Sequence, residues 1–407
     1  MSNYSHRGYE HRTGGYGRRR HKASGFKRKS GGGTAAKVAA VTAVSIGILA
    51  LVYLFADNVI PFVDSIKGAQ GPTPDVPVSA GIKETAEQPP EQAQGSFDSV
   101  DGSVFVQNGS GYVPFKGIET TAKNYSAILN SISSSMSESV NIYSAVIPTN
   151  AEFGLKGVLS GNGSQRENLD IIDSSLSDRV KVIDVYSALE AQKNDYIFYR
   201  TDESMTSKGA YYVYKKIAET AGYGERTVYS LSTLSEKSGT LSPFYGSFVE
   251  RTTDPKTQPE GNPELAKSAD TIEYYKLPVH YNCYSVDPKT GGKVETDLFK
   301  ESAAAVDLLK IFPAKDTALL EIENVQESGS KKLLIVKDHS AEPVIGYLVP
   351  HYSDVYVADV SLYSGNLMEY VNENEITDVL IINGIEDANN SLYCQRLRDL
   401  FDHSISD

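Results

Sequence analysis

Two stretches of strand length, "KLLIVKD" at residues 332–338 and "DVLIING" at residues 378–384, each contain an uninterrupted apolar run, at residues 333–336 and 379–382. Such runs are typical of strands buried on both faces of a sheet, because a strand with one solvated face would alternate polar and apolar residues. "DVYVADV", residues 354–360, comes between them in the chain, and "GNLMEYVNENE", residues 365–375, has a helical pattern. This alternation predicts a mainly parallel sheet covered by helices on both sides.

The same alternation extends toward the N-terminus. Apolar runs at residues 141–149 and 180–185 predict two more strands, and "SVFVQNGSGYVPF", residues 103–115, predicts two short strands around a glycine turn. Three helices are expected from apolar residues at three- and four-residue steps: one capped by Thr120 or Thr121, one marked by Leu169, Ile172 and Leu176, and one that runs from a cap at Ser207 to Gly222. Residues 225–315 contain only weak strands and are expected to be an excursion from the sheet, not an independent domain.

Parallel sheets bind ligands at the carboxyl ends of their strands. Asp338, His339 and Ser340 follow the predicted strand at residues 332–337 and are therefore the first candidate site residues. The acidic pair Asp170 and Asp173 lies on one predicted helix, and we interpret it as a solvated face and not as a glycosidase pair.

Charge is unevenly distributed along the 407 residues. Residues 1–37 hold ten Lys or Arg and one acid, which leaves 29 basic and 51 acidic residues in the remainder. A surface that acidic repels nucleic acid, so a main domain that binds DNA or RNA is not expected. The basic segment has no apolar period and is expected to be disordered, serving either as an orientation signal that contacts anionic lipid or as a cytoplasmic binding tail.

Residues 38–56, "VAAVTAVSIGILALVYLFA", form a run of nineteen residues without a charge. A helix of this length spans about 28 Å, close to the thickness of the hydrocarbon core of a bilayer. We expect an uncleaved single-pass anchor in the cell membrane, since a signal peptide would have a shorter basic region and a shorter apolar run. The positive residues would stay in the cytoplasm, a Pro- and Gln-rich stalk would follow at residues 57–98, and residues 99–407 would fold outside the membrane.

Neither a cofactor nor a metal site is expected from the motifs. The sequence has no HExxH or CxxC spacing and no glycine-rich nucleotide loop. The two cysteines, Cys283 and Cys394, carry no spacing signature, so a disulfide and a pair of free buried thiols are equally good interpretations.

Several segments resemble one known family. They are "VIPTNAEF", "VKVIDVYSAL", "YIFYRTD", "GSFVERT", "DTIEYY", "KKLLIVKD" and "PHYSDVYVADV", and they resemble the DHHW family of Gram-positive envelope proteins in collinear order over roughly residues 100–390. That family is similar to the SGNH-like domains of alginate O-acetylation proteins. The resemblance implies an α/β SGNH-like three-layer sandwich for residues 99–407.

The resemblance also implies a triad in which an Asp-x-His pair comes from the DHHW loop and a serine follows a later Lys-Asp. Asp202 matches the first position, but Ser204 replaces the histidine expected to be the base, while Glu203 and Met205 replace the other His and the Trp. In the later motif, Lys337 and Asp338 match, whereas His339 occupies the nucleophile position and Ser340 is displaced by one residue. "FPAKD", residues 312–316, aligns only loosely with a segment that would help to form an oxyanion site.

Three functional hypotheses follow from these departures. The first is a noncatalytic protein that binds or scaffolds at the cell envelope, with membrane lipid, an envelope polysaccharide or a membrane acyltransferase as its partner; the 26 tyrosines could stack on sugars. The second is an active acyl esterase or O-acetyltransferase with an exchanged pair, in which Ser204 is the nucleophile, His339 the base, and Asp338 or Asp202 orients the imidazole. The third is a structural envelope protein without a ligand cleft.

Overall fold

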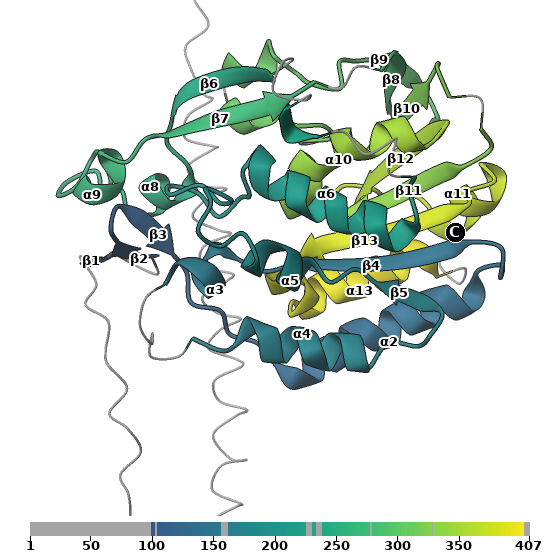
Figure 1. Cartoon of the computed structure of the whole chain (residues 1–407), viewed down its shortest axis with the longest axis horizontal. Coiled ribbons are helices and arrows are strands. Elements are labelled where there is room, and N and C mark those ends of the chain that lie inside the picture. The colour runs from purple at the N-terminus through teal and green to yellow at the C-terminus, as the bar shows by residue number, and fades with distance from the viewer. Residues whose placement is uncertain are drawn as a thin grey trace, which may run out of the picture. The chain divides into compact units, whose positions relative to one another are not determined.

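An eight-stranded mixed sheet lies at the centre of the molecule (Figure 1). The computed structural model describes residues 99–402, with the exception of 102–103, 156–161, 225–229, 233–237, 277–278, 306 and 328. The strand order is β5-β4-β13-β11-β12-β10-β8-β9. Their bounds are β4 (Asn141–Ile147), β5 (Val180–Val182), β8 (Tyr281–Val286), β9 (Lys293–Glu295), β10 (Leu319–Asn324), β11 (Lys332–Lys337), β12 (Asp354–Asp359) and β13 (Asp378–Gly384).

The predicted parallel pairing holds for only part of the eight-stranded sheet. The strands from β5 to β12 pair in parallel, whereas β10, β8 and β9 extend the sheet in antiparallel fashion. Strands β8 and β9 come from residues 225–315, so the expectation that this region leaves the sheet is wrong for these two strands. The signal was weak because β8 mixes buried, half-buried and exposed positions and β9, at the sheet edge, is exposed throughout.

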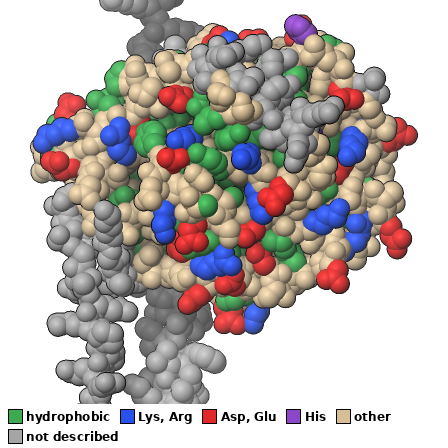
Figure 2. Space-filling view, in the orientation of Figure 1, with side chains coloured by type: hydrophobic (Ala, Val, Ile, Leu, Met, Phe, Trp, Pro, Cys, Tyr) green, Lys and Arg blue, Asp and Glu red, His purple; other side chains and the backbone are tan. Residues whose placement is uncertain are grey.

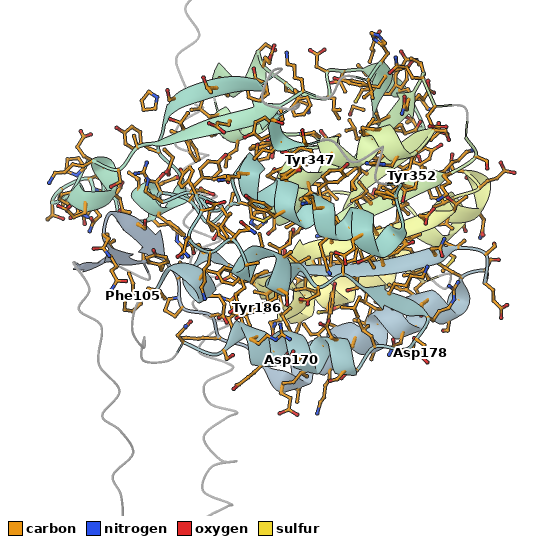
Figure 3. All side chains as sticks on the ribbon, in the orientation of Figure 1. Phe105, Asp170, Asp178, Tyr186, Tyr347 and Tyr352 are labelled. Carbon is orange, nitrogen blue, oxygen red and sulfur yellow. The ribbon has the colours of Figure 1, made fainter. Side chains whose placement is uncertain are left out.

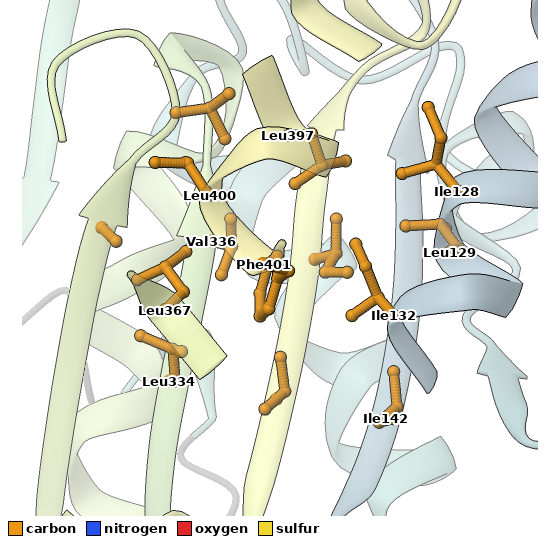
Figure 4. Packing of buried hydrophobic residues seen from close by; sticks show 14 of the residues in the cluster. Ile128, Leu129, Ile132, Ile142, Leu334, Val336, Leu367, Leu397, Leu400 and Phe401 are labelled. Atoms are coloured by element: carbon orange, nitrogen blue, oxygen red, sulfur yellow. The ribbon is translucent and has the colours of Figure 1, made fainter. Parts of the chain in front are cut away.

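Helices cover both faces of the sheet, which confirms the predicted three layers (Figure 1). Alternate residues of a strand point to opposite faces: Leu333 and Ile335 pack in one core cluster, and Leu334 and Val336 pack in the other (Figure 4). The first cluster is covered by α5 (Val185–Glu190), α6 (Ser207–Ala221) and α10 (Glu342–Leu348). The second is covered by α2 (Glu119–Ser135), α4 (Gln165–Ser174), α11 (Leu367–Glu373), α12 (Ile385–Ala388) and α13 (Ser391–Phe401).

Smaller elements surround the carboxyl end of the sheet. A three-stranded sheet contains β1 (Ser99–Asp101), β2 (Val104–Gln107) and β3 (Ser110–Tyr112), and its predicted turn is confirmed, with positive φ at Asn108 and Gly109. A separate ribbon pairs β6 (Ser238–Phe244) with β7 (Asp270–Tyr275). Short helices complete the fold: α3 (Asn150–Gly154), α8 (Ser247–Arg251), α9 (Pro263–Ala266), η2 (Ala303–Ala305), η3 (Leu308–Ile311), η4 (His339–Ala341) and η5 (Val349–His351).

The predicted N-caps of two helices differ from the observed ones by one to three residues. Helix α2 begins at Glu119, before the expected caps Thr120 and Thr121. Helix α6 is capped by Thr206, whose hydroxyl accepts a hydrogen bond from the amide of Gly209, and not by Ser207. Its predicted end is confirmed, because Gly222 has a φ of 71° in the left-handed region that glycine favours.

The basic segment at residues 1–37, the predicted span at residues 38–56 and the stalk at residues 57–98 lie outside the described residues. Within the described part of the chain, no helix has the length and apolar character needed to cross a membrane. Basic and acidic side chains are interspersed on the face that carries α5 and α6 (Figure 2).

The two cysteines are free and buried. Cys283 packs in the cluster under α6, whereas Cys394 packs in the cluster on the opposite face of the sheet. Of the two interpretations left open by the sequence, the structure has free thiols.

Many of the tyrosines are core residues. Tyr347 and Tyr352, labelled in Figure 3, are only 3% and 2% exposed. Neither ring can stack on a sugar in this structure, so the abundance of tyrosine does not by itself indicate a carbohydrate surface.

Candidate functional site

The loop at residues 202–205 is held as a tight turn ahead of α6. Phe198 and Met205 form an antiparallel bridge, the amide of Tyr199 donates to the carbonyl of Ser204 at 3.2 Å, and the amide of Thr206 donates to the carbonyl of Ile197 at 3.0 Å. These contacts fix the two ends of the loop, which therefore presents Glu203 and Ser204 in a defined position. We call residues 202–205 the motif loop.

Asp202 is buried and supports the motif loop from within. Its carboxylate accepts hydrogen bonds from the amide of Ser204 at 2.9 Å and from the amide of Ser247 at 2.7 Å. The backbone at Gly246 passes so close that an added Cβ would lie 2.3 Å from Asp202 Cβ. Asp202 is thus used to join the motif loop to α8, and it makes no described contact with His339.

A second buried carboxylate, Asp270, anchors the chain just before the motif loop. It accepts hydrogen bonds from Thr201 N at 2.8 Å, Thr201 Oγ1 at 2.6 Å, Arg200 N at 3.2 Å and Arg200 Nε at 3.1 Å, and one from the hydroxyl of Tyr196. Sequence reasoning did not single out Asp270, because its partners are about 70 residues away in the chain and the pairing depends on the position of β7.

The other side of the site is built at the end of β11. Asp338 Oδ1 accepts from the amide of Ser340 at 2.8 Å, and its Oδ2 accepts from the amide of Gly384 at 2.7 Å. The preceding Lys337 is fully buried and pairs with Asp359 at 2.7 Å and with Glu342 at 3.0 Å. Lys337 and Asp338, the two residues that match the later motif, therefore stabilise the end of β11.

Both motifs meet in one small pocket of about 60 Å³. The predicted residues Ser204, Asp338, His339 and Ser340 line it, and Asp202 does not. The pocket lies where β4, β11 and β13 end, as the strand-end rule predicts. Sequence reasoning missed Glu386 and Asp387, which also line it; they follow the buried strand at residues 378–384, so the same rule could have found them.

Charges within the pocket are coupled. His339 Nε2 lies 3.6 Å from Glu203 Oε1, and Arg251 Nη1 lies 3.7 Å from Glu203 Oε2. The contact with Glu203 raises the pKa of His339 to about 9, and the contact with His339 lowers the pKa of Glu203. Burial and the neighbouring carboxylate of Asp338 raise the pKa of Asp387 to about 7. At neutral pH, His339 is therefore a cation.

The ligand atoms of Asp338, His339 and Asp387 lie within 4.8 Å of one another, the one such grouping among the residues that the structure describes. The set fits a metal ion poorly. The contact with Glu203 favours the protonated imidazole of His339, whereas a metal ligand must be the neutral imidazole.

The remaining sequence expectations concern groups that catalysis would need. No hydrogen bond joins Ser204 to His339 within the described ranges. Residues 312–316, the loose match to an oxyanion segment, do not line the pocket. Asp170 is exposed and pairs with Arg166 at 3.1 Å on α4, in line with a solvated face (Figure 3). Asp173 is half-buried, and burial raises its pKa to about 6, so the predicted solvated face holds for Asp170 and not for Asp173.

The family of the chain follows from comparison with known proteins. A model described as "DHHW protein" matches residues 91–358, which contain both motifs that meet in the pocket. The chain belongs to the DHHW family. No curated protein matches this DHHW protein in sequence.

Solved structures resemble this DHHW protein. A DHHW family protein from Eubacterium siraeum DSM 15702 is 26% identical, with a TM-score of 0.63, over 75% of this chain and 98% of that one. Bacillus cereus PatB1 is 16% identical, with a TM-score of 0.56, over 72% of this chain and 98% of that one; this likeness concerns the fold. PatB1 has also been solved with a sulfonyl adduct, at 15% identity and a TM-score of 0.56, over 71% of this chain and 96% of that one.

Proposed function

We propose that this DHHW protein is a noncatalytic binding or scaffolding protein of the cell envelope, tethered to the membrane through residues 38–56. We also propose that it acts beside polysaccharide O-acetylation enzymes or binds the polysaccharide itself. The family match and the shared SGNH-like fold support a common scaffold. A protein can keep its fold after it has lost the catalytic groups built on that fold. The residues at the site therefore distinguish a binding protein from an enzyme.

The observation that carries the proposal is the pairing of His339 with Glu203 across the pocket. His339 stands where the resemblance places the nucleophile, and an imidazole that is cationic at neutral pH cannot accept a proton from a serine. Glu203 and Ser204 stand where the resemblance places histidines. The residues that remain from the motif, Asp202, Lys337 and Asp338, all have structural hydrogen bonds or ion pairs.

The exchanged pair is the alternative, and one observation favours it: Ser204 and His339 line the same pocket. Catalysis by this pair would require His339 to lose its proton and to turn from Glu203 toward Ser204. Activity of this origin should therefore increase as the pH rises through the raised pKa of His339. A pH profile distinguishes this mechanism from background hydrolysis when it is compared with that of a His339 variant.

The first test is hydrolysis of an aryl acetate by the full-length protein in detergent micelles between pH 6 and 10. Ser204→Ala and His339→Ala are measured beside His280→Ala, a control at an exposed histidine away from the pocket. We expect no turnover above buffer in any sample. Turnover that both pocket variants abolish, and that His280→Ala retains, would establish the exchanged pair and disprove the noncatalytic proposal.

A covalent probe gives an independent test. An arylsulfonyl fluoride attaches to an activated serine oxygen with loss of fluoride, and a sulfonyl adduct is what the PatB1 structure contains. We expect the intact mass of this DHHW protein to be unchanged by the reagent. A single adduct that disappears in Ser204→Ala or in a Ser340→Ala variant would show that one of these hydroxyls is a nucleophile after all.

A further inference from the structure

Lys337 carries a buried amine that the proposed function does not use. Its side chain has no exposed surface, and its Nζ lies 2.7 Å from Asp359 Oδ2 and 3.0 Å from Glu342 Oε1. Both carboxylates are buried as well, with side chains that are only 10% and 6% exposed. One amine is therefore enclosed with two carboxyl groups where solvent has almost no access.

The central sheet aligns the amine with one of these carboxyl groups. Strands β11 and β12 are parallel neighbours, and Lys337 is directly opposite Asp359 in their register although 22 residues separate the two in the chain. The amide of Ser361 donates to Asp359 Oδ1 at 2.8 Å, so Oδ1 is held by the backbone and Oδ2 faces Lys337. The amine and the carboxyl carbon can thus meet without any change in the pairing of the strands.

The charges of these three side chains favour a neutral product. Burying an ammonium with two carboxylates has a large desolvation cost, and one carboxylate remains in excess. An amide between Lys337 and Asp359 would replace two of the three charges with a neutral group. Glu342 would still have a cation nearby, because Lys315 Nζ lies 3.8 Å from Glu342 Oε2.

We infer that Lys337 and Asp359 condense to form an intramolecular isopeptide bond between β11 and β12. Lys337 Nζ attacks Asp359 Cγ, a C–N bond forms, and the bond from Cγ to Oδ2 breaks. Oδ2 leaves as water and takes two protons from the ammonium, while Oδ1 remains as the carbonyl oxygen of the amide. No atom is oxidised or reduced, and no further reactant is needed.

Glu342 is placed to move the protons. Burial acts to lower the pKa of Lys337, but the two carboxylates outweigh it and the pKa is raised, so the amine must lose a proton before it attacks. Glu342 Oε1 can accept that proton at 3.0 Å, and burial raises the pKa of Glu342, which favours its protonated form. Glu342 then donates the proton to the departing oxygen, while the amide of Ser361 stabilises the negative charge that develops on Oδ1.

The bond would fix the end of β11 that presents Asp338 and His339 to the pocket. It would do so whether the pocket binds a ligand or catalyses a reaction. The inference is therefore independent of the proposed function, and neither the aryl acetate assay nor the sulfonyl fluoride probe bears on it.

The test is the mass of the full-length protein, purified in detergent micelles and then denatured. We expect a mass below the value calculated from the sequence by one water molecule, about 18 Da. Trypsin cleaves after free lysine, so residues 333–396 should remain one peptide that lacks one water. Chymotrypsin should then cut between the two strands, at Tyr347 or Tyr352, and leave two peptides joined through Lys337 and Asp359. The full calculated mass, or release of residues 333–337 as a separate tryptic peptide, would overturn the inference.

Variants identify the reacting groups. Lys337→Arg keeps a cation that cannot condense and should have its full calculated mass; loss of water in this variant would place the dehydration elsewhere and refute the bond. Glu342→Gln cannot accept the proton and should also keep its full mass. The control is Glu375→Gln, at an exposed carboxylate that pairs with Lys332 at the other end of β11, and it should lose the water as the unmodified protein does.

Equal loss of water in Glu342→Gln and in the unmodified protein would refute the role of Glu342. The peptide map of the unmodified protein decides the bond by itself, so the inference can be rejected even if a variant at a buried position fails to fold.

Discussion

The imidazole of His339 lies 3.6 Å from the carboxylate of Glu203, and this contact connects the end of β11 to the motif loop. Each residue occupies a position where the DHHW motifs lead one to expect another: a nucleophile in the case of His339, and a histidine in the case of Glu203. The two replacements are chemically complementary, since a cation at one position offsets an anion at the other. The resemblance alone did not indicate this relationship, because it assigns a residue type to each position and gives no distance between the two motifs.

The pKa of His339 should depend on Glu203. In Glu203→Gln the pKa of His339 should fall from about 9 toward its ordinary value of 6.5, because the largest cause of the increase is removed. A histidine with a raised pKa stabilises the fold below its ordinary pKa, and this stabilisation is lost as the pH rises through the raised value. Histidine ring signals followed by NMR across a pH titration measure the change.

The control for this titration is Glu219→Gln, which removes an exposed acid that pairs with Lys216 on α6. This variant should leave the titration midpoint of His339 unchanged. If Glu203→Gln also leaves that midpoint unchanged, Glu203 and His339 do not interact in solution.

Asp387 should make stability depend on pH in the acidic range. Its pKa is raised from 3.8 to about 7 by burial and by Asp338, so its favourable contribution is complete below about pH 4 and is lost as the pH rises through 7. Asp387→Asn cannot ionise and should therefore gain stability relative to the unmodified protein as the pH increases. Melting temperatures at pH 4.5 and pH 8 measure this gain. Asp170→Asn, at an exposed position, is the control, and a pH-independent effect of Asp387→Asn would contradict the prediction.

Lys337 should be one of the most sensitive positions in the fold. Its side chain is fully buried between Asp359 and Glu342, and Lys337→Met would leave two carboxylates without their cation, at a cost of about 3 to 5 kcal/mol in the free energy of unfolding. Urea denaturation measures the loss. Lys332→Met is a matched control at the other end of β11, where the ammonium is partly exposed and its carboxylate partner, Glu375, is largely exposed; this variant should change stability far less. Similar losses in the two variants would argue against the buried ion pairs.

Asp270 should control the order of the motif loop. Asp270→Asn keeps the size of the side chain but removes the charge that accepts hydrogen bonds from Arg200 and Thr201, so we expect a loss of about 2 to 3 kcal/mol. Amide hydrogen exchange at residues 200–204 should accelerate. Asp254→Asn, which alters an exposed turn where Lys256 N donates to the aspartate, is the control. Unchanged protection of the motif loop in Asp270→Asn would show that other contacts are sufficient to hold it.

The buried parallel strands could be predicted with accuracy because their signal is local. Apolar runs such as the one at residues 378–384 have few other stable environments, and the end of α6 at Gly222 needs only one residue with a left-handed conformation. Strand β9 at the antiparallel edge escaped prediction, since it has no buried residue to mark it. The cap of α6 was misplaced by one residue because Thr206 and Ser207 have equivalent hydroxyl groups, and only the path of the backbone decides which one faces the first turn.

The sequence by itself determined the alternation of buried strands with helices and the absence of histidines where the DHHW motif expects them. These features depend on residue type and apolar spacing, both of which are written along the chain. Only the tertiary structure decided that the motif loop meets residues 338–340, that His339 pairs with Glu203, that Asp270 supports the loop and that Asp387 joins the pocket. Each of these depends on distances between residues far apart in the sequence, and such distances exist only once the sheet has assembled.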